Sequence, residues 1–255
     1  MAENTLSTVL KSDLEAVKGG LPADFNIQRF VNNAIALLNG NDTLKKFVQK
    51  NGTAQVKNGL MQGAYLGLDA LRNEFYLIPY GDKLDFRIDY RGEQKLVEKY
   101  SIRPVKEIYA KVVRQGDDFQ EKIVNGVPTI DFMPMPFNAN PVIGAFAVCL
   151  FEDGGLVYEA MNLEELEAVK KKSQKSAAWA EFTNEMYKKA VLRRLCKHIK
   201  IDFETPTQQE IYNEDMAIVT QPNIEEEIEE KANAEEFVID GQFTETEETE
   251  TVELP

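Results

Sequence analysis

Lysines and arginines within residues 177–200 have the spacing of a helix that could contact phosphate groups. At about 100° per residue, a single ridge that begins aromatic and ends cationic contains Trp179, Phe182, Met186, Lys189, Arg193 and Lys197. A second, apolar ridge of Tyr187, Val191 and Leu195 should face the core. Because Lys and Arg neutralise phosphates, such a helix suits sequence-independent contact with a nucleic-acid backbone. The alternative is a solvated basic face beside an aromatic cap on the core.

Further cations and aromatics favour the nucleic-acid interpretation. Four lysines precede this helix: Lys170, Lys171, Lys172 and Lys175. Five further cations lie in or beside predicted strands: Arg87, Arg91, Lys106, Lys111 and Arg114. The tyrosines interleaved with them are Tyr76, Tyr80, Tyr90 and Tyr109. Bases that stack on aromatics and phosphates that pair with cations are typical of a single-strand groove. Strand alternation places Lys106 and Arg114 on one side and Lys111 on the other, so not all can share a groove. Core packing remains the alternative for each tyrosine.

Catalytic constellations are hard to assemble from this sequence. The chain has one histidine, His198, which lies two residues from Cys196 and would point to another side of a helix. Asp85 and Asp89 lie about 13 Å apart along a predicted strand, too far to chelate one ion with Glu93. No GxxxxGK[ST] motif occurs. We therefore expect no catalytic residue, no metal site and no cofactor, and keep a metal-dependent nuclease as an alternative class.

The charge of the chain must be read by segment. The formal net charge is −14, but residues 204–255 hold 17 of the 43 acidic residues and one lysine. Residues 1–203 then carry 26 acids and 28 bases, so an acidic tail follows a slightly basic body. No apolar run reaches the roughly 18 residues that a membrane span needs. With Cys149 as the only other cysteine, a reduced, cytoplasmic protein without membrane contact is expected.

The elements that would position these residues are helices, then hairpins, then helices. Helical patterns cover 25–38, 42–49 and a segment after Thr53, and strands are predicted at 75–79 and 84–90. In the second strand, Asp85, Arg87 and Asp89 should form a charged, exposed face. Asn125-Gly126 predicts a tight hairpin turn between 119–124 and 127–132, and three prolines predict a loop at 133–141. Strands at 105–114, 142–151 and 156–161 and helices at 162–172 and 177–200 complete the body.

Three glycines recur at i+4 spacing in the predicted helix after Thr53. Gly59, Gly63 and Gly67 weaken a helix and so suggest a close neighbour. That neighbour could be the protein's own sheet, a second subunit or a DNA backbone. We assign them to oligomerisation.

The fold class expected is α+β, with N-terminal helices and a central antiparallel sheet of hairpins packed against a long C-terminal helix. The expected organisation is a flexible N-terminal arm (1–24), a DNA-binding and oligomerisation domain (25–203) and an acidic, largely disordered tail (204–255).

Several blocks of this sequence resemble one known family. Gly67-Leu68 followed by Phe75-Tyr-Leu-Ile-Pro-Tyr-Gly81, then Asp89-Tyr-Arg-Gly92, and then Val112-Val-Arg-Gln-Gly-Asp117 are similar to conserved segments of the RecT proteins of phages and prophages. Trp179, Glu185-Met186, Lys188-Lys189 and Arg193-Arg194 resemble a further block. The blocks stand in the family order over about residues 25–203.

The resemblance implies ATP-independent binding of single-stranded DNA, annealing of complementary strands in phage recombination and repair, and a fold related to the lambda Red beta annealing protein. It also implies self-association into rings or helical filaments and a partner exonuclease. Matched positions that would contact DNA are Arg87, Arg91, Arg114, Lys188, Lys189, Arg193 and Arg194. Charge and spacing add Lys111, Lys172, Lys175 and Lys197, and Tyr76, Tyr90, Trp179 and Phe182 are candidate base or groove contacts.

The role of the acidic tail and one alternative class of protein stay open beside this interpretation. The acidic tail could compete with DNA for the groove or recruit a host single-strand-binding protein. A filament-forming scaffold without affinity for DNA is the other alternative class.

Overall fold

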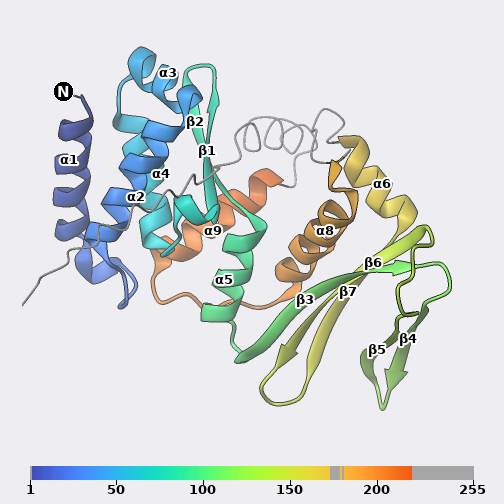
Figure 1. Ribbon diagram of the computed structural model, residues 1–255. Coiled ribbons are helices and arrows are strands. Elements are labelled where there is room, and N and C mark those ends of the chain that lie inside the picture. The colour runs from blue at the N-terminus through green and yellow to red at the C-terminus, as the bar shows by residue number, and fades with distance from the viewer. Residues whose placement is uncertain (1, 173–178, 180, 220–255) are drawn as a thin grey trace, which may run out of the picture.

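The computed structural model describes residues 2–172, 179 and 181–219 (Figure 1). The helices are α1 (Ala2–Ala16), α2 (Ile27–Gly40), α3 (Asp42–Asn51), α4 (Ala54–Tyr65), α5 (Tyr90–Tyr100), α6 (Leu163–Lys172), α8 (Thr183–His198) and α9 (Pro206–Val219), with short 3-10 turns at Lys18–Gly20 and Ala70–Arg72. The strands are β1 (Phe75–Tyr80), β2 (Lys83–Ile88), β3 (Val105–Arg114), β4 (Asp118–Val124), β5 (Val127–Met133), β6 (Val142–Phe151) and β7 (Leu156–Asn162). This order confirms the α+β class.

The N-terminal half is a helical layer packed around the antiparallel β1–β2 hairpin (Figure 1). The flexible arm predicted for residues 1–24 is wrong for most of its length, since α1 runs to Ala16. Leu6, Leu10 and Leu14 recur every four residues and are buried in the same core as α2 and α4. Burial of one leucine contributes about 1.5–3 kcal/mol, which fixes α1 to the body.

The glycines of α4 face the protein's own hairpin rather than a second subunit. A Cβ atom at Gly59 would lie 2.5 Å from a side-chain carbon of Leu77, and one at Gly63 would lie 2.6 Å from the ring of Phe75. Gly67 follows the helix with a positive φ of 70° and lies against Pro22. Their assignment to oligomerisation is therefore wrong, because close packing of α4 on β1 already explains them.

The C-terminal half is built on the three-stranded antiparallel sheet β3–β6–β7 (Figure 1). Tyr187, Val191 and Leu195 of α8 are buried in the cluster on one face, as their spacing predicts. The β4–β5 hairpin packs on the other face, where the rings of Phe119 and Phe132 contact Phe146 at centroid distances of 5.2 and 4.9 Å. The sheet is thus covered on both sides, and its β3 edge is a boundary of the site described below.

The tail predicted from residue 204 begins too early. Helix α9 packs against α4 and β2, and its Ile211 and Tyr212 belong to the N-terminal core. Tyr212 also contacts Phe203, whose ring centroid is 5.4 Å away. The remaining tail, residues 220–255, lies outside the described residues. No helix in the part of the chain that the structure describes has the length and apolarity to cross a membrane.

Helix α8 is shorter than the predicted helix over 177–200. A break at Phe182 precedes it, with φ and ψ of −121° and 39°, and α8 begins at Thr183. Phe182 is therefore the N-cap residue of α8, and the helix predicted over 177–200 is interrupted there.

Candidate nucleic-acid interface

A cleft of about 270 Å³ lies where the end of β3, the loop after β5 and the first turns of α8 meet. We call it the β3–α8 cleft. Its lining residues are Lys111, Val112, Arg114, Asp117, Phe132, Pro134, Met135, Asn138 and Lys188. Three cationic side chains thus share one cleft with a single carboxylate.

Lys111 and Arg114 reach the same cleft although strand alternation predicted opposite sides. Two features of β3 explain the difference. The strand lies at the edge of its sheet, so its free side is open to both faces. Its pairing with β6 also shifts register between Val113 and Arg114, so the regular alternation of faces is interrupted at the end of the strand. Alternation is therefore wrong in placing Lys111 and Arg114 on opposite sides, while Lys106, the third cation of β3, does not line the cleft.

Asp117 holds the wall of the cleft in place. Its carboxylate accepts hydrogen bonds from the backbone N–H of Arg114 at 2.7 Å, from the backbone N–H of Met135 at 3.0 Å and from the Asn138 side chain at 2.8 Å. Desolvation alone would raise the pKa of the Asp117 carboxyl, but these hydrogen bonds lower it below its ordinary value. The carboxylate is therefore ionised at neutral pH, and its hydrogen bonds join the end of β3 to the loop after β5.

The cations of the cleft have few local acidic partners. Lys188 forms an ion pair with Glu185 one turn earlier on α8. The Arg114 guanidinium donates to the carbonyl oxygen of Asn140 at 2.7 Å, which orients it without neutralising it. Lys111 is exposed on β3. Three positive charges against Asp117 and Glu185 leave the cleft net positive and suited to a polyanion.

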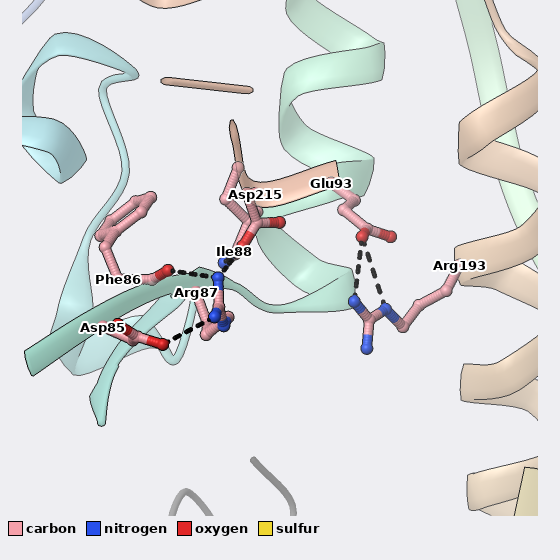
Figure 2. Close-up of polar contacts among 7 residues, drawn as sticks. All are labelled: Asp85, Phe86, Arg87, Ile88, Glu93, Arg193 and Asp215. Atoms are coloured by element: carbon pink, nitrogen blue, oxygen red, sulfur yellow. Dashed lines mark hydrogen bonds and ion pairs between the residues drawn. The ribbon is translucent and has the colours of Figure 1, made fainter. Parts of the chain in front are cut away.

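The cationic ridge of α8 faces helix α5 instead of solvent. Lys189 lies 3.3 Å from Asp89, and Arg193 lies 3.4 Å from Glu93, with most of each side chain buried. Figure 2 shows the Glu93–Arg193 pair bridging the two helices. Desolvation raises the pKa of Glu93 to about 7, and Arg193 partly opposes that increase. This ridge is an interhelical ion-pair seam in the described structure.

Arg87 is a structural residue rather than a DNA contact in this structure. Only 2% of it is exposed, and it lies 2.8 Å from Asp85 and 3.7 Å from Asp215 of α9 (Figure 2). Asp215 also accepts a hydrogen bond from the backbone N–H of Ile88 at 3.2 Å. The prediction that the charged face of β2 is exposed is therefore wrong at Arg87 and Asp89, because α5, α8 and α9 cover these residues.

The other predicted cations lie in separate places. Arg91 is exposed on the first turn of α5, over the ring of Tyr90 at 5.3 Å. Arg194 pairs with Glu159 at 2.7 Å and Glu165 at 2.9 Å, on the β7 and α6 side of α8. Lys197 is exposed near the end of α8. The side chain of Lys172 and all of Lys175 lie outside the described residues.

The aromatic candidates divide into buried and exposed rings. Trp179 is buried and packs on Tyr187 at a centroid distance of 5.9 Å, which makes it a core residue here. Burial raises the pKa of Tyr76, a half-buried residue. Tyr90 lies between Arg91 and Lys189, the latter 5.5 Å above its ring. Phe182 is 50% exposed.

Sequence reasoning missed several residues that shape the site. Asp117 and Asn138 brace the loop, yet they stand in segments assigned only as turn and loop. Asp215 was counted with the acidic tail. The available signals were the position of Asp117 directly after a Gly turn, and Ile211 and Tyr212 as apolar residues one turn before Asp215.

Fold and site together define a class of protein: an antiparallel α+β protein with a cation-lined cleft at a sheet edge. Within the part of the chain that the structure describes, no group of three or more His, Cys, Asp or Glu side chains is arranged to hold a metal ion. The chain belongs to the RecT family, whose family model matches residues 28–235 of its 255 residues.

A similar protein is the Protein RecT of Escherichia coli (strain K12). The two are 28% identical over 170 residues, and the match covers 60% of this chain. The chain likewise spans about 60% of the length of that relative. The family assignment confirms the resemblance inferred from the sequence blocks.

Proposed function

We propose that this chain binds single-stranded DNA in the β3–α8 cleft and anneals complementary strands in phage recombination without ATP. The observation that carries the proposal is the convergence of Lys111, Arg114 and Lys188 on one cleft in a member of the RecT family. Lys and Arg at such a cleft bind phosphates of any sequence, and base pairing with the second strand then supplies the specificity. The absence of a phosphate-binding GxxxxGK[ST] motif from the sequence fits a reaction that uses no nucleotide.

The strand would continue past the cleft over other exposed cations. Arg91 and Lys197 are candidates, since both are exposed. Lys189 and Arg193 would contact phosphates only after exchange of their partners Asp89 and Glu93. Each such contact would exchange a carboxylate for a phosphate as the anionic partner of the cation.

Assembly and partners complete the proposal. Many copies side by side, in a ring or a helical filament, would join their clefts into one continuous groove that holds a strand or the annealed duplex. A partner exonuclease would supply the single strand. The acidic segment 220–255 would contact a host single-strand-binding protein or compete with DNA for the cleft.

The salt dependence of DNA binding tests the cleft. The variant Lys111→Ala/Lys188→Ala removes two candidate phosphate contacts, so the slope of log K against log salt should become less steep by about 1.4 for single strands. A matched control is Lys46→Ala/Lys83→Ala, which removes two exposed lysines of the N-terminal half. Fluorescence anisotropy with a labelled oligonucleotide measures both. An unchanged slope in the cleft variant, or an equal change in the control, would remove the cleft from the DNA path.

A further inference from the structure

Phe137 has an unusual backbone conformation and a fully exposed ring, and its side chain makes no packing contact with the described residues that would explain either. The residue has a relative exposure of 105% and a φ of 54°. The left-handed region is uncommon for a residue other than glycine and is costly for a bulky side chain. A fully exposed aromatic ring also gains no burial that would offset this strain. Backbone strain of this kind is typical of functional positions.

The loop that carries Phe137 is braced on both sides of the ring. Asp117 accepts hydrogen bonds from Met135 and Asn138, two residues before and one residue after Phe137. The Asn138 side chain in turn accepts from the backbone N–H of Asn140 at 2.9 Å. The side chain of Asn140 donates to the carbonyl oxygen of Gln115 at 2.8 Å. The exposed position of the ring is therefore specified by the loop.

Phe137 belongs to the loop that lines the β3–α8 cleft. Met135 and Asn138, which flank it in sequence, both line the cleft together with Lys111 and Lys188. An exposed ring on a loop that shares a cleft with cations matches what a single strand presents, since each nucleotide offers a flat apolar base next to a phosphate.

We propose that Phe137 stacks on a nucleobase of the strand whose phosphates lie in the β3–α8 cleft. The inference rests on the proposed function and adds a base contact to it. The exposed aliphatic residues Ile123, Val124 and Val127 lie at the far end of the β4–β5 hairpin, beside the Asn125-Gly126 turn. Met133 and Met135 are also exposed and shortly precede Phe137, so a second copy of the chain is the competing occupant, which the sedimentation measurement below distinguishes. The base is the occupant that the neighbouring cations favour.

The experiment compares oligonucleotides with and without bases. Wild type, Phe137→Leu and Phe137→Trp are titrated against a labelled 30-nucleotide single strand and against a matched strand of abasic sites. Phe137→Leu keeps an apolar side chain but removes the ring, so affinity for the base-containing strand should fall about tenfold. Phe137→Trp should retain it. Affinity for the abasic strand and the salt slope should be the same in all three proteins.

Controls separate stacking from other roles of the ring. Ile123→Ala changes a residue that is 77% exposed on the β4–β5 hairpin, which precedes this loop, and this variant should bind both strands as wild type does. Phe137→Asn suits the left-handed backbone, so it keeps the loop folded and should bind DNA as Phe137→Leu does. Far-ultraviolet circular dichroism of each variant checks folding.

The outcomes that overturn the inference are distinct from failure of the proposed function. Wild-type affinity in Phe137→Leu, or an equal loss on base-containing and abasic strands, would overturn stacking while leaving the cleft intact. A change in sedimentation of Phe137→Leu without DNA would reassign the ring to contact between copies. If wild type binds neither strand, the proposed function and this inference fall together.

Discussion

Glu93 makes the stability of this protein depend on pH in a direction unusual for an acidic side chain. Its carboxyl group has no solvent exposure, and its Oε1 lies 3.4 Å from Arg193. Oε2 has no hydrogen-bond partner among the described residues. The cost of desolvating this charge dominates, so the pKa of Glu93 is raised from 4.5 to about 7. Asp215 and Asp89 add repulsion, while Arg193 and Lys197 oppose the shift.

The size of the effect follows from linkage between protonation and folding. The folded protein binds a proton more tightly than the unfolded chain, so Glu93 contributes stability that is fully present below about pH 4.5 and is lost as the pH rises through about 7. The full shift corresponds to about 3 kcal/mol. Between pH 5.5 and 8 the free energy of unfolding should fall by about 2 kcal/mol. Burial also raises the pKa of Asp215, which acts in the same direction.

Urea unfolding at fixed protein concentration, from pH 5.5 to 8, measures this dependence. Glu93→Gln removes the titrating group and should lose most of the decline, retaining the part contributed by Asp215. Glu93→Gln/Asp215→Asn should show the flattest profile. His198→Gln, which removes the single histidine of the chain, should leave the decline in place. A wild-type stability that rises from pH 5.5 to 8, or a Glu93→Gln variant with the full decline, would refute the reasoning.

Two further perturbations test the packing around the site. Asp215→Ala leaves Arg87 buried with Asp85 as its one remaining acidic partner, so it should destabilise the fold by about 3 kcal/mol in urea unfolding. Glu214→Ala on the exposed side of α9 should change stability by less than about 0.5 kcal/mol. Equal effects of the two substitutions would mean that α9 is not docked. Gly63→Ala places a methyl group 2.6 Å from the ring of Phe75 and should cost about 1–2 kcal/mol in thermal or urea unfolding. Sedimentation of Gly63→Ala should remain that of wild type, and a change in assembly would restore a role for this glycine between subunits.

Local patterns in the sequence predicted much of the fold. Asn125-Gly126 specified the β4–β5 turn, where both residues adopt the positive φ that such a turn requires. Alternation and helical periodicity located the other strands and the buried side of α8. These signals work because they depend on neighbours within a few residues.

Long-range contacts explain most of the errors. One acidic partner of Arg87, Asp215, comes from α9, 128 positions away, and no local pattern indicates that a charged strand face will be covered. The acidic composition of residues 204–219 led to a wrong prediction of disorder, whereas Pro206–Val219 form a helix that packs on the core. For α1, the spacing of Leu6, Leu10 and Leu14 was visible, but the polar residues between them outweighed it.

The candidate site was predicted in its residue types but not in its grouping. Lys111 and Arg114 line one cleft because a register shift and a free strand edge interrupt the alternation that alone would separate them. Lys189 and Arg193 have the predicted spacing, yet their acidic partners on α5 become apparent only when the two helices pack. The positive φ and the exposed ring of Phe137 have no signature in the sequence, because backbone angles and exposure are properties of the folded loop.

The most direct test of the central claim is the rate at which two labelled complementary oligonucleotides anneal, followed by energy transfer at low ionic strength without ATP. The account predicts that wild type accelerates annealing, that Lys111→Glu/Lys188→Glu loses the acceleration, and that Lys46→Glu/Lys83→Glu retains it. Annealing no faster with wild-type protein than without it, or a charge-reversed cleft that works as well as wild type, would contradict the account.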